Sequence, residues 1–170
     1  MIEQDYLDSC IKRFKECKAL GDKTFAQLDE EQLNWQPNEA SNNIAMIIQH
    51  LHGNMLSRWT NFLTEDGEKL WRNRDEEFER HDLSRERLLL MWEEAWQLVL
   101  DTLASLTTDQ LTQKIAIRTE SLTVVDAINR QLGHYSYHIG QIVFLGKWLL
   151  NNNWQTLSIP KGDPKNLILN

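Results

Sequence analysis

The chain of 170 residues has few cysteines, prolines and glycines, and no long uninterrupted run of apolar residues. Its only two cysteines, Cys10 and Cys17, lie about two turns apart on a predicted helix, too far for a disulfide bond. We therefore expect two buried, reduced thiols. No apolar run approaches the roughly 18 residues that a membrane-spanning helix needs, and the acidic start of the chain does not resemble a secretion signal. The sequence predicts a soluble, cytoplasmic protein that does not bind membranes.

Basic residues are fewer than acidic ones. The chain has 18 Lys and Arg and 25 Asp and Glu, which gives a formal net charge of -7. Nucleic-acid-binding modules concentrate Lys and Arg in one stripe, whereas here the basic residues are scattered among acids. This distribution argues against a nucleic-acid partner. A chain of this length can bury its own core without disulfides or metal ions, so we expect a single domain over residues 1–170.

Apolar residues recur at helical spacing in four long segments. The segments run from Tyr6 to Leu28, from a cap at Ser41-Asn42-Asn43 to about Leu63, from Ser84 to Leu106, and from Val124 to about Leu150. Capping residues support these starts, since Ser, Thr and Asn side chains accept hydrogen bonds from the first free N–H groups of a helix.

The remaining segments lack helical periodicity. The charged stretch from Thr64 to Asp82 predicts a long loop between the second and third helices. The short alternation at Ile115-Ala116-Ile117 predicts an extended connector, and the residues from Asn151 onward predict a coil tail. We therefore expect an all-α protein, an antiparallel four-helix bundle, which is an architecture that builds metal sites from facing side chains.

The fourth helical segment carries His134 and His138, whose imidazoles lie on one face and can bind the same ion. Gln141 follows on the same row and could orient a ligand or a bound water. The second segment offers a third imidazole from His50 or His52, but these two differ by about 200° around the helix, so both cannot point inward. His52 lies nearer the apolar stripe and His50 lies on a polar-lined row, and spacing alone does not decide between them. Imidazoles suit zinc, nickel or ferrous iron.

The stretch Ser41-Asn42-Asn43-Ile44-Ala45-Met46-Ile47-Ile48-Gln49-His50-Leu51, followed by the distant His134-x-x-x-His138-x-Gly140-Gln141-Ile142, resembles the DinB-like superfamily over nearly the whole chain. The stretches Phe62–Lys69 and Trp71–Asp75 resemble a branch of uncharacterised bacterial members. The resemblance implies a four-helix bundle, commonly a homodimer, with a divalent ion held by His50, His134 and His138. It favours His50 over His52 because the first ligand of the family precedes a Leu and follows an aliphatic residue by six positions.

Better-characterised DinB-like proteins include metal-dependent transferases and isomerases that use a low-molecular-weight thiol, so the resemblance implies a function of this class. We expect a divalent-metal-dependent enzyme, a transferase that activates such a thiol for reaction with a small-molecule substrate. A metal-hydroxide hydrolase and a non-catalytic dimeric binding module are the alternatives. A closed structural metal site would need a fourth protein ligand, for which the two cysteines are the only evident donors. The sequence identifies neither the catalytic groups nor the substrate.

Several side chains have two interpretations each. Arg72 and Arg74 could bind the carboxylates of an acidic thiol, because guanidinium groups match carboxylate geometry, or they could pair with the acidic residues at 75–77. Trp92 and Trp96, one helical turn apart, could fill the core or anchor a twofold interface between subunits.

Overall fold

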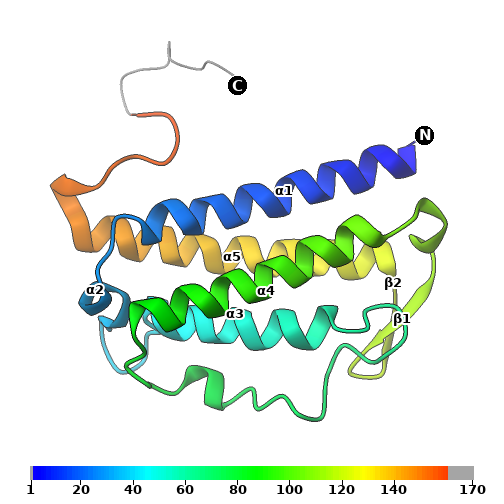
Figure 1. Ribbon diagram of the computed structural model, residues 1–170, viewed down its shortest axis with the longest axis horizontal. Coiled ribbons are helices and arrows are strands. Elements are labelled where there is room, and N and C mark those ends of the chain that lie inside the picture. The colour runs from blue at the N-terminus through cyan, green and yellow to red at the C-terminus, as the bar shows by residue number, and fades with distance from the viewer. Residues whose placement is uncertain (1, 161–170) are drawn as a thin grey trace.

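The computed structural model describes residues 2–160, and these residues are mostly helical (Figure 1). The helices are α1 (Ile2–Phe25), α2 (Glu30–Asn34), α3 (Ile44–Trp59), α4 (Arg85–Ser105) and α5 (Val124–Leu150), with short 3-10 turns η1 (Glu76–Phe78), η2 (Thr108–Gln110) and η3 (Asn151–Asn153). The strands β1 (Lys114–Ile117) and β2 (Glu120–Thr123) pair antiparallel, with Ile115 opposite Leu122. The expected extended connector is therefore one arm of a hairpin.

Side-chain caps fix the starts of three long helices, α3, α4 and α5. The side chain of Asn43 accepts a hydrogen bond from the backbone N–H of Met46, and Ser84 and Thr123 cap α4 and α5 in the same way. The second long helix nevertheless ends at Trp59 rather than near Leu63. The chain turns there, and Asn61 takes a left-handed backbone conformation with φ of 51°.

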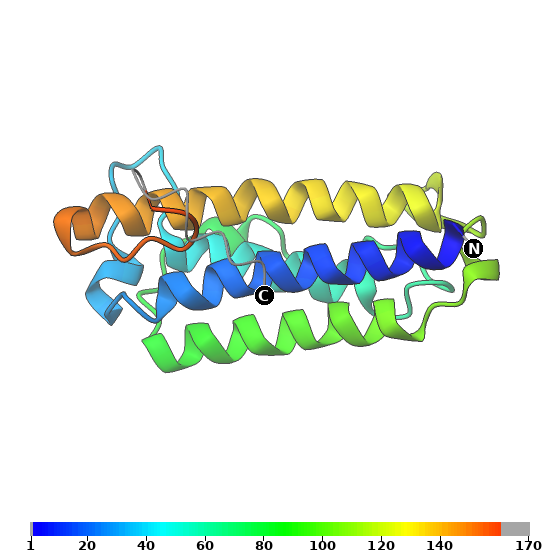
Figure 2. The same cartoon turned by 90° about the horizontal axis from the view of Figure 1, so that it is seen from above.

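The four long helices lie side by side along the length of the molecule (Figures 1 and 2). α3 packs against α4 and α1 packs against α5, while contacts of α1 with α4 and of α3 with α5 complete the arrangement. α1 and α5 run in one direction, and α3 and α4 run in the other (Figure 1).

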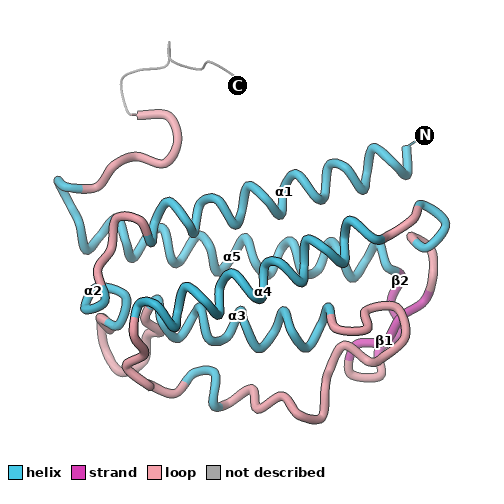
Figure 3. The backbone as a smooth tube through the Cα atoms, viewed as in Figure 1, coloured by secondary structure: helices cyan, strands magenta, loops and turns pink. Residues whose placement is uncertain are grey.

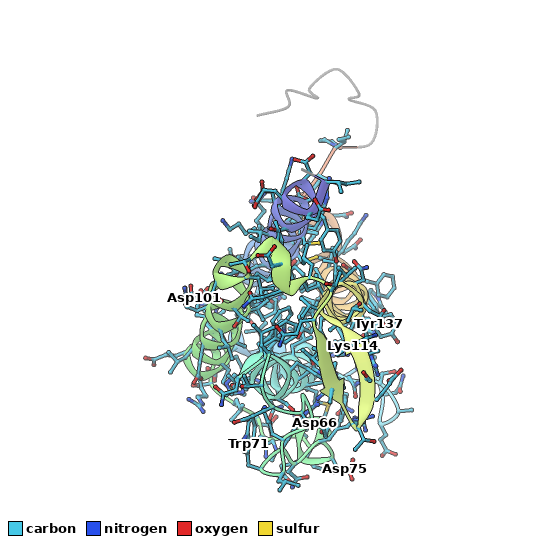
Figure 4. All side chains as sticks on the ribbon, turned by 90° about the vertical axis from the view of Figure 1, so that its right-hand side faces the viewer. Asp66, Trp71, Asp75, Asp101, Lys114 and Tyr137 are labelled. Atoms are coloured by element: carbon cyan, nitrogen blue, oxygen red, sulfur yellow. The ribbon has the colours of Figure 1, made fainter. Side chains whose placement is uncertain are left out.

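The expected antiparallel order is therefore wrong for two neighbouring pairs, since α3 and α4 are parallel and so are α1 and α5. The connection between α3 and α4 runs back along the whole length of α3, as the loop trace in Figure 3 shows. An end-on view places Asp66, Trp71 and Asp75 of this connection on the far side of α3 from α1 (Figure 4). Along this path, η1 packs against α3.

Large aromatic side chains fill the centre of the core. Phe14 makes edge-to-face contacts with Trp59 at 5.8 Å, Tyr135 at 6.0 Å and Trp96 at 6.5 Å between ring centroids. Trp92 and Trp96 are 2 % and 0 % exposed, so they fill the core and do not anchor an interface between subunits.

The two cysteines are free thiols, of which Cys10 is buried and Cys17 is partly exposed, so the expected burial holds only for Cys10. The tail expected from Asn151 begins with the 3-10 turn η3 and continues without regular structure to residue 160. The prediction of coil for residues 161–170 lies outside the described residues. Among residues 2–160, every helix is too short or too polar to cross a lipid bilayer.

Candidate metal centre

Three imidazoles meet between α3 and α5. The Nε2 atom of His134 lies 3.2 Å from Nε2 of His50 and 3.1 Å from Nε2 of His138. One nitrogen from each ring lies within 4.8 Å of the other two, so the three side chains could hold one metal ion. α3 supplies His50 and α5 supplies the other two, one helical turn apart.

Hydrogen bonds on the outer side of the rings determine which nitrogen faces the centre. Nδ1–H of His50 donates to Oε2 of Glu77 at 2.9 Å, and Nδ1–H of His138 donates to Oε1 of Gln141 at 3.1 Å. Carboxylate and amide oxygens are acceptors, so each Nδ1 carries the proton and each Nε2 presents a lone pair to the centre. The position predicted for Gln141 as an orienting residue thus matches a direct contact with His138.

This arrangement, with protons on the outer Nδ1 atoms and lone pairs on the inner Nε2 atoms, suits a bound cation. Two lone pairs, from His50 and His138, both approach Nε2 of His134, and one proton on that atom can satisfy only one of them well. The two Nε2 separations of 3.1 and 3.2 Å also fit a shared ion. Nitrogens bound to one ion at metal–nitrogen distances near 2.0–2.1 Å lie about 3.3 Å apart in a tetrahedral site and about 2.9 Å apart in an octahedral one. The donor set and two of its three separations therefore fit a divalent transition metal, and all three nitrogens lie within 4.8 Å of one another.

Glu77 is held in place by Arg72. The guanidinium group donates from Nε to Oε1 at 2.7 Å and from Nη2 to Oε2 at 2.8 Å, and both side chains are buried. Burial alone would raise the pKa of Glu77, but its hydrogen bonds with Arg72 and His50 outweigh burial and lower that pKa. Glu77 is therefore an ionised carboxylate that orients the imidazole of His50.

Gly53 makes room for this carboxylate on α3. A Cβ atom at position 53 would lie 2.1 Å from Oε1 of Glu77 and 2.7 Å from its Cδ. Glycine at position 53 therefore leaves the space that the end of the Glu77 side chain occupies. The sequence suggested Glu77 only as an ion-pair partner of an arginine and gave no role to Gly53, although a glycine inside a helix, three positions after a histidine, was a usable signal of close approach.

The structure distinguishes the two candidate histidines of α3. Nε2 of His52 lies 3.0 Å from Oε2 of Glu94 on α4, away from the pair on α5, whereas His50 reaches that pair. Neither cysteine belongs to the cluster, and Cys17 instead contacts Oγ of Ser136 at 3.4 Å. Among the described residues, the fourth ligand that a closed structural site would need is not provided by a thiol.

The cluster opens into a pocket of about 430 Å³. Its lining consists of His50, Asn54, Arg58, Arg72, Arg74, Phe78, Arg118, Arg130, Gln131, His134, Tyr137 and His138. A larger hollow of about 550 Å³ lies at the end of α1 against residues 150–157 and contains no histidine. The chemistry of the lining, rather than size, therefore points to the pocket at the histidines.

The predicted substrate-binding arginines both line this pocket. Arg72 pairs with Glu77, as one of its two interpretations expected. Arg74 lies over the ring of Phe78 at 5.1 Å, and Phe78 in turn stacks on His50 at 4.7 Å. Arg74 is therefore placed beside the histidine cluster, and the carboxylate with which it pairs, on Asp75, is 3.9 Å away.

The sequence matches one family model over residues 1–163, described as Protein of unknown function (DUF1572). The chain belongs to the DUF1572 family. No curated protein matches this DUF1572 chain.

Burial makes two histidines of the DUF1572 chain weak bases. Burial, followed by the nearby charges of His138, His50, Arg58 and Arg72, lowers the pKa of His134 from 6.5 to about 3. Burial, followed by His50, lowers the pKa of His138 from 6.5 to about 4. Both side chains are therefore neutral at neutral pH, which is the form that binds a metal ion.

The metal-free DUF1572 protein is expected to lose stability as the pH falls from 6.5 to about 4. In this range the unfolded chain binds protons at His134 and His138 that the folded protein does not bind. The stability is complete above the unfolded pKa and is lost as the pH falls towards the lowered folded values. Urea unfolding at pH 7 and pH 5 measures this loss, and a His134→Gln variant should lose less. An equal loss in the two proteins would contradict the assignment.

Proposed function

We propose that the protein is a divalent-metal-dependent enzyme with His50, His134 and His138 as metal ligands, on a single DinB-like four-helix-bundle domain. We further propose that it is a transferase that activates a low-molecular-weight thiol. One observation carries the proposal, namely the convergence of three imidazole nitrogens beside an open pocket. Membership of DUF1572 and the motifs shared with DinB-like proteins support the fold class.

A divalent ion held by three neutral ligands keeps its full charge and lowers the pKa of a thiol or water that contacts it. The residues of the chain supply the rest of the site. Glu77 and Gln141 fix the rings of His50 and His138, so that little reorganisation is needed when the ion binds. Zinc, nickel and ferrous iron all accept such ligands.

Arg72 and Arg74 are the proposed substrate-binding residues. Arg74 stands at the pocket over Phe78, where it can pair with a carboxylate of an acidic thiol. Arg72 contributes a fixed positive charge while it holds Glu77. A cytoplasmic location fits this chemistry, because thiols are kept reduced there, and it fits the two free cysteines of the chain.

A homodimer is the proposed assembly. Tyr137, Phe144 and Trp148 are 64 %, 64 % and 58 % exposed, and they lie at helical spacing along α5. Figure 4 shows Tyr137 pointing outward from this helix. An exposed apolar strip of this kind is typical of a contact between subunits. The same strip supports the alternative of a non-catalytic dimeric module, and the open pocket equally supports a hydrolase that activates water.

The test begins with elemental analysis of protein purified without a histidine tag, which should contain about one divalent ion per chain.

The protein is then assayed with a panel of low-molecular-weight thiols and an aryl chloride. In this reaction sulfur replaces chlorine on the ring, and the thiol proton and chloride are released. Chelation should abolish the reaction, and one equivalent of metal should restore it. Metal-dependent cleavage of nitrophenyl esters without thioether formation would instead indicate a hydrolase. Tag-free protein without metal and without either reaction would refute the proposal.

A further inference from the structure

The pocket at the histidines is positively charged within an acidic protein. Among residues 2–160, five arginines and no Asp or Glu line it, although the whole chain has a net charge of -7. The other lining residues are histidines, amides and aromatic rings. A pocket lined by one sign of charge concentrates ligands of the opposite sign.

The carboxylates behind these arginines are too few to neutralise them. Arg58 and Arg118 share one carboxylate, that of Glu68, at 3.0 and 2.7 Å. Arg130 pairs with Glu120 at 2.9 Å, and Arg72 pairs with Glu77.

Arg74 forms the weakest ion pair of the five arginines. Its nearest carboxylate, on Asp75, is 3.9 Å away, and the side chain of Asp75 is 97 % exposed. An exposed pair at this distance contributes little. Five guanidinium groups therefore face three carboxylates within 3.0 Å, with Asp66 near Arg58 and Asp75 near Arg74 as weaker partners, so the lining keeps a surplus of positive charge for a ligand.

Two polar atoms of the lining also lack partners. Within residues 2–160, buried Nη1 of Arg72 has no hydrogen bond, and the nearest carboxylate oxygen, Oε1 of Glu68, is 3.8 Å away. The side-chain oxygen of Gln131 is likewise buried and unpaired. Buried polar groups are rarely left unsatisfied, and such a group on a charged residue costs the most. Arg72 therefore keeps hydrogen-bonding capacity that its carboxylate partners do not use, whereas the Gln131 oxygen is an acceptor and needs a donor.

We propose that this pocket binds a small dianion, a molecule with two carboxylates or one phosphate group, beside the histidine cluster. Arg74 and Arg118, with side chains 53 % and 55 % exposed, meet the anionic groups, while Arg72 provides buried positive charge. The proposal deepens the proposed function by naming the charge class of the substrate of the same site. It rests on that function only for the role of the anion as substrate, because the arginines need no metal to bind it.

The test is isothermal titration calorimetry on chelator-treated protein at constant ionic strength, with succinate, inorganic phosphate and acetate as probes. At least one dianion should bind about tenfold or more tightly than acetate, since a second charge-assisted contact adds at least this much. Tighter binding of succinate would indicate a dicarboxylate, and tighter binding of phosphate would indicate a phosphate ester.

Arg74→Gln and Arg118→Gln should each weaken binding of that dianion about tenfold. Arg13→Gln is the matched control, because Arg13 is an exposed arginine on α1 that pairs with Glu16. Circular dichroism checks that each variant is folded.

Equal binding of acetate and both dianions, or an equal loss in Arg13→Gln, would overturn the proposal. Metal content is measured separately on untreated protein. If the untreated protein contains metal but the protein does not bind dianions, this inference alone is refuted. If the protein binds dianions but contains no metal, the proposed function alone is refuted.

Discussion

Replacing His138 with alanine is expected to abolish tight metal binding while leaving the helical fold intact. The variant removes one of three nitrogens that converge on the same point, and two remaining imidazoles bind a divalent ion much more weakly. We expect a loss of more than about 100-fold in affinity, the upper range for removing a residue that only supports a ligand. Alanine favours helix, so α5 should persist.

The matched control is His52→Ala, which removes a histidine from α3 that pairs with Glu94 rather than with the cluster. Metal titration with a competing chromophoric chelator measures the affinity, and far-ultraviolet circular dichroism measures the helix content. Similar metal affinity in wild type and His138→Ala, or an equal loss in His52→Ala, would show that the three histidines do not form the metal site.

The second prediction concerns Gly53, which has no chemical role of its own. Gly53→Ala should weaken metal binding about 10–100-fold, the range seen when a partner of a metal-binding histidine is lost. The new methyl group would occupy the position of the Glu77 carboxylate, and this carboxylate cannot move aside without breaking its bonds to Arg72 and His50. The imidazole of His50 would then lose its orientation.

Gly133→Ala provides the control for this variant. It makes the same change on α5, next to His134, where an added Cβ meets no atom within 4 Å. Alanine in place of a helical glycine stabilises by about 0.5–1 kcal/mol, so Gly133→Ala should be more stable with unchanged metal affinity. Urea unfolding and metal titration measure both quantities. Unchanged metal affinity in Gly53→Ala would mean that the contact between Glu77 and His50 does not support the site.

Local sequence signals were sufficient to place the later helices. Ser84 and Thr123 cap α4 and α5 because a hydroxyl at the start of a helix satisfies N–H groups only a few residues away. The relation between His134 and His138 is equally local, since a four-residue spacing on a helix fixes it. Such signals depend on neighbours in the chain and can be read without a structure.

The path of the connection between α3 and α4 could not be predicted in this way. A charged, aperiodic stretch indicates a loop, but the direction of the loop depends on which distant surface it packs against. The contact of Glu77 with Gly53 is of this kind, and so is the parallel order of α3 and α4 (Figure 1). The choice between His50 and His52 also depends on tertiary structure. The periodicity that placed His52 near the core stripe did not reveal that Glu94 of α4 would pair with it.

The connection between the parallel helices has an engineering consequence. A designer who simplifies this protein would shorten that segment first, because the long helices carry the core. The shortened protein would keep its hydrophobic interior and lose the carboxylate that aims one of its three imidazoles. In this molecule, the part that looks most expendable to folding is the part that orients the candidate metal centre.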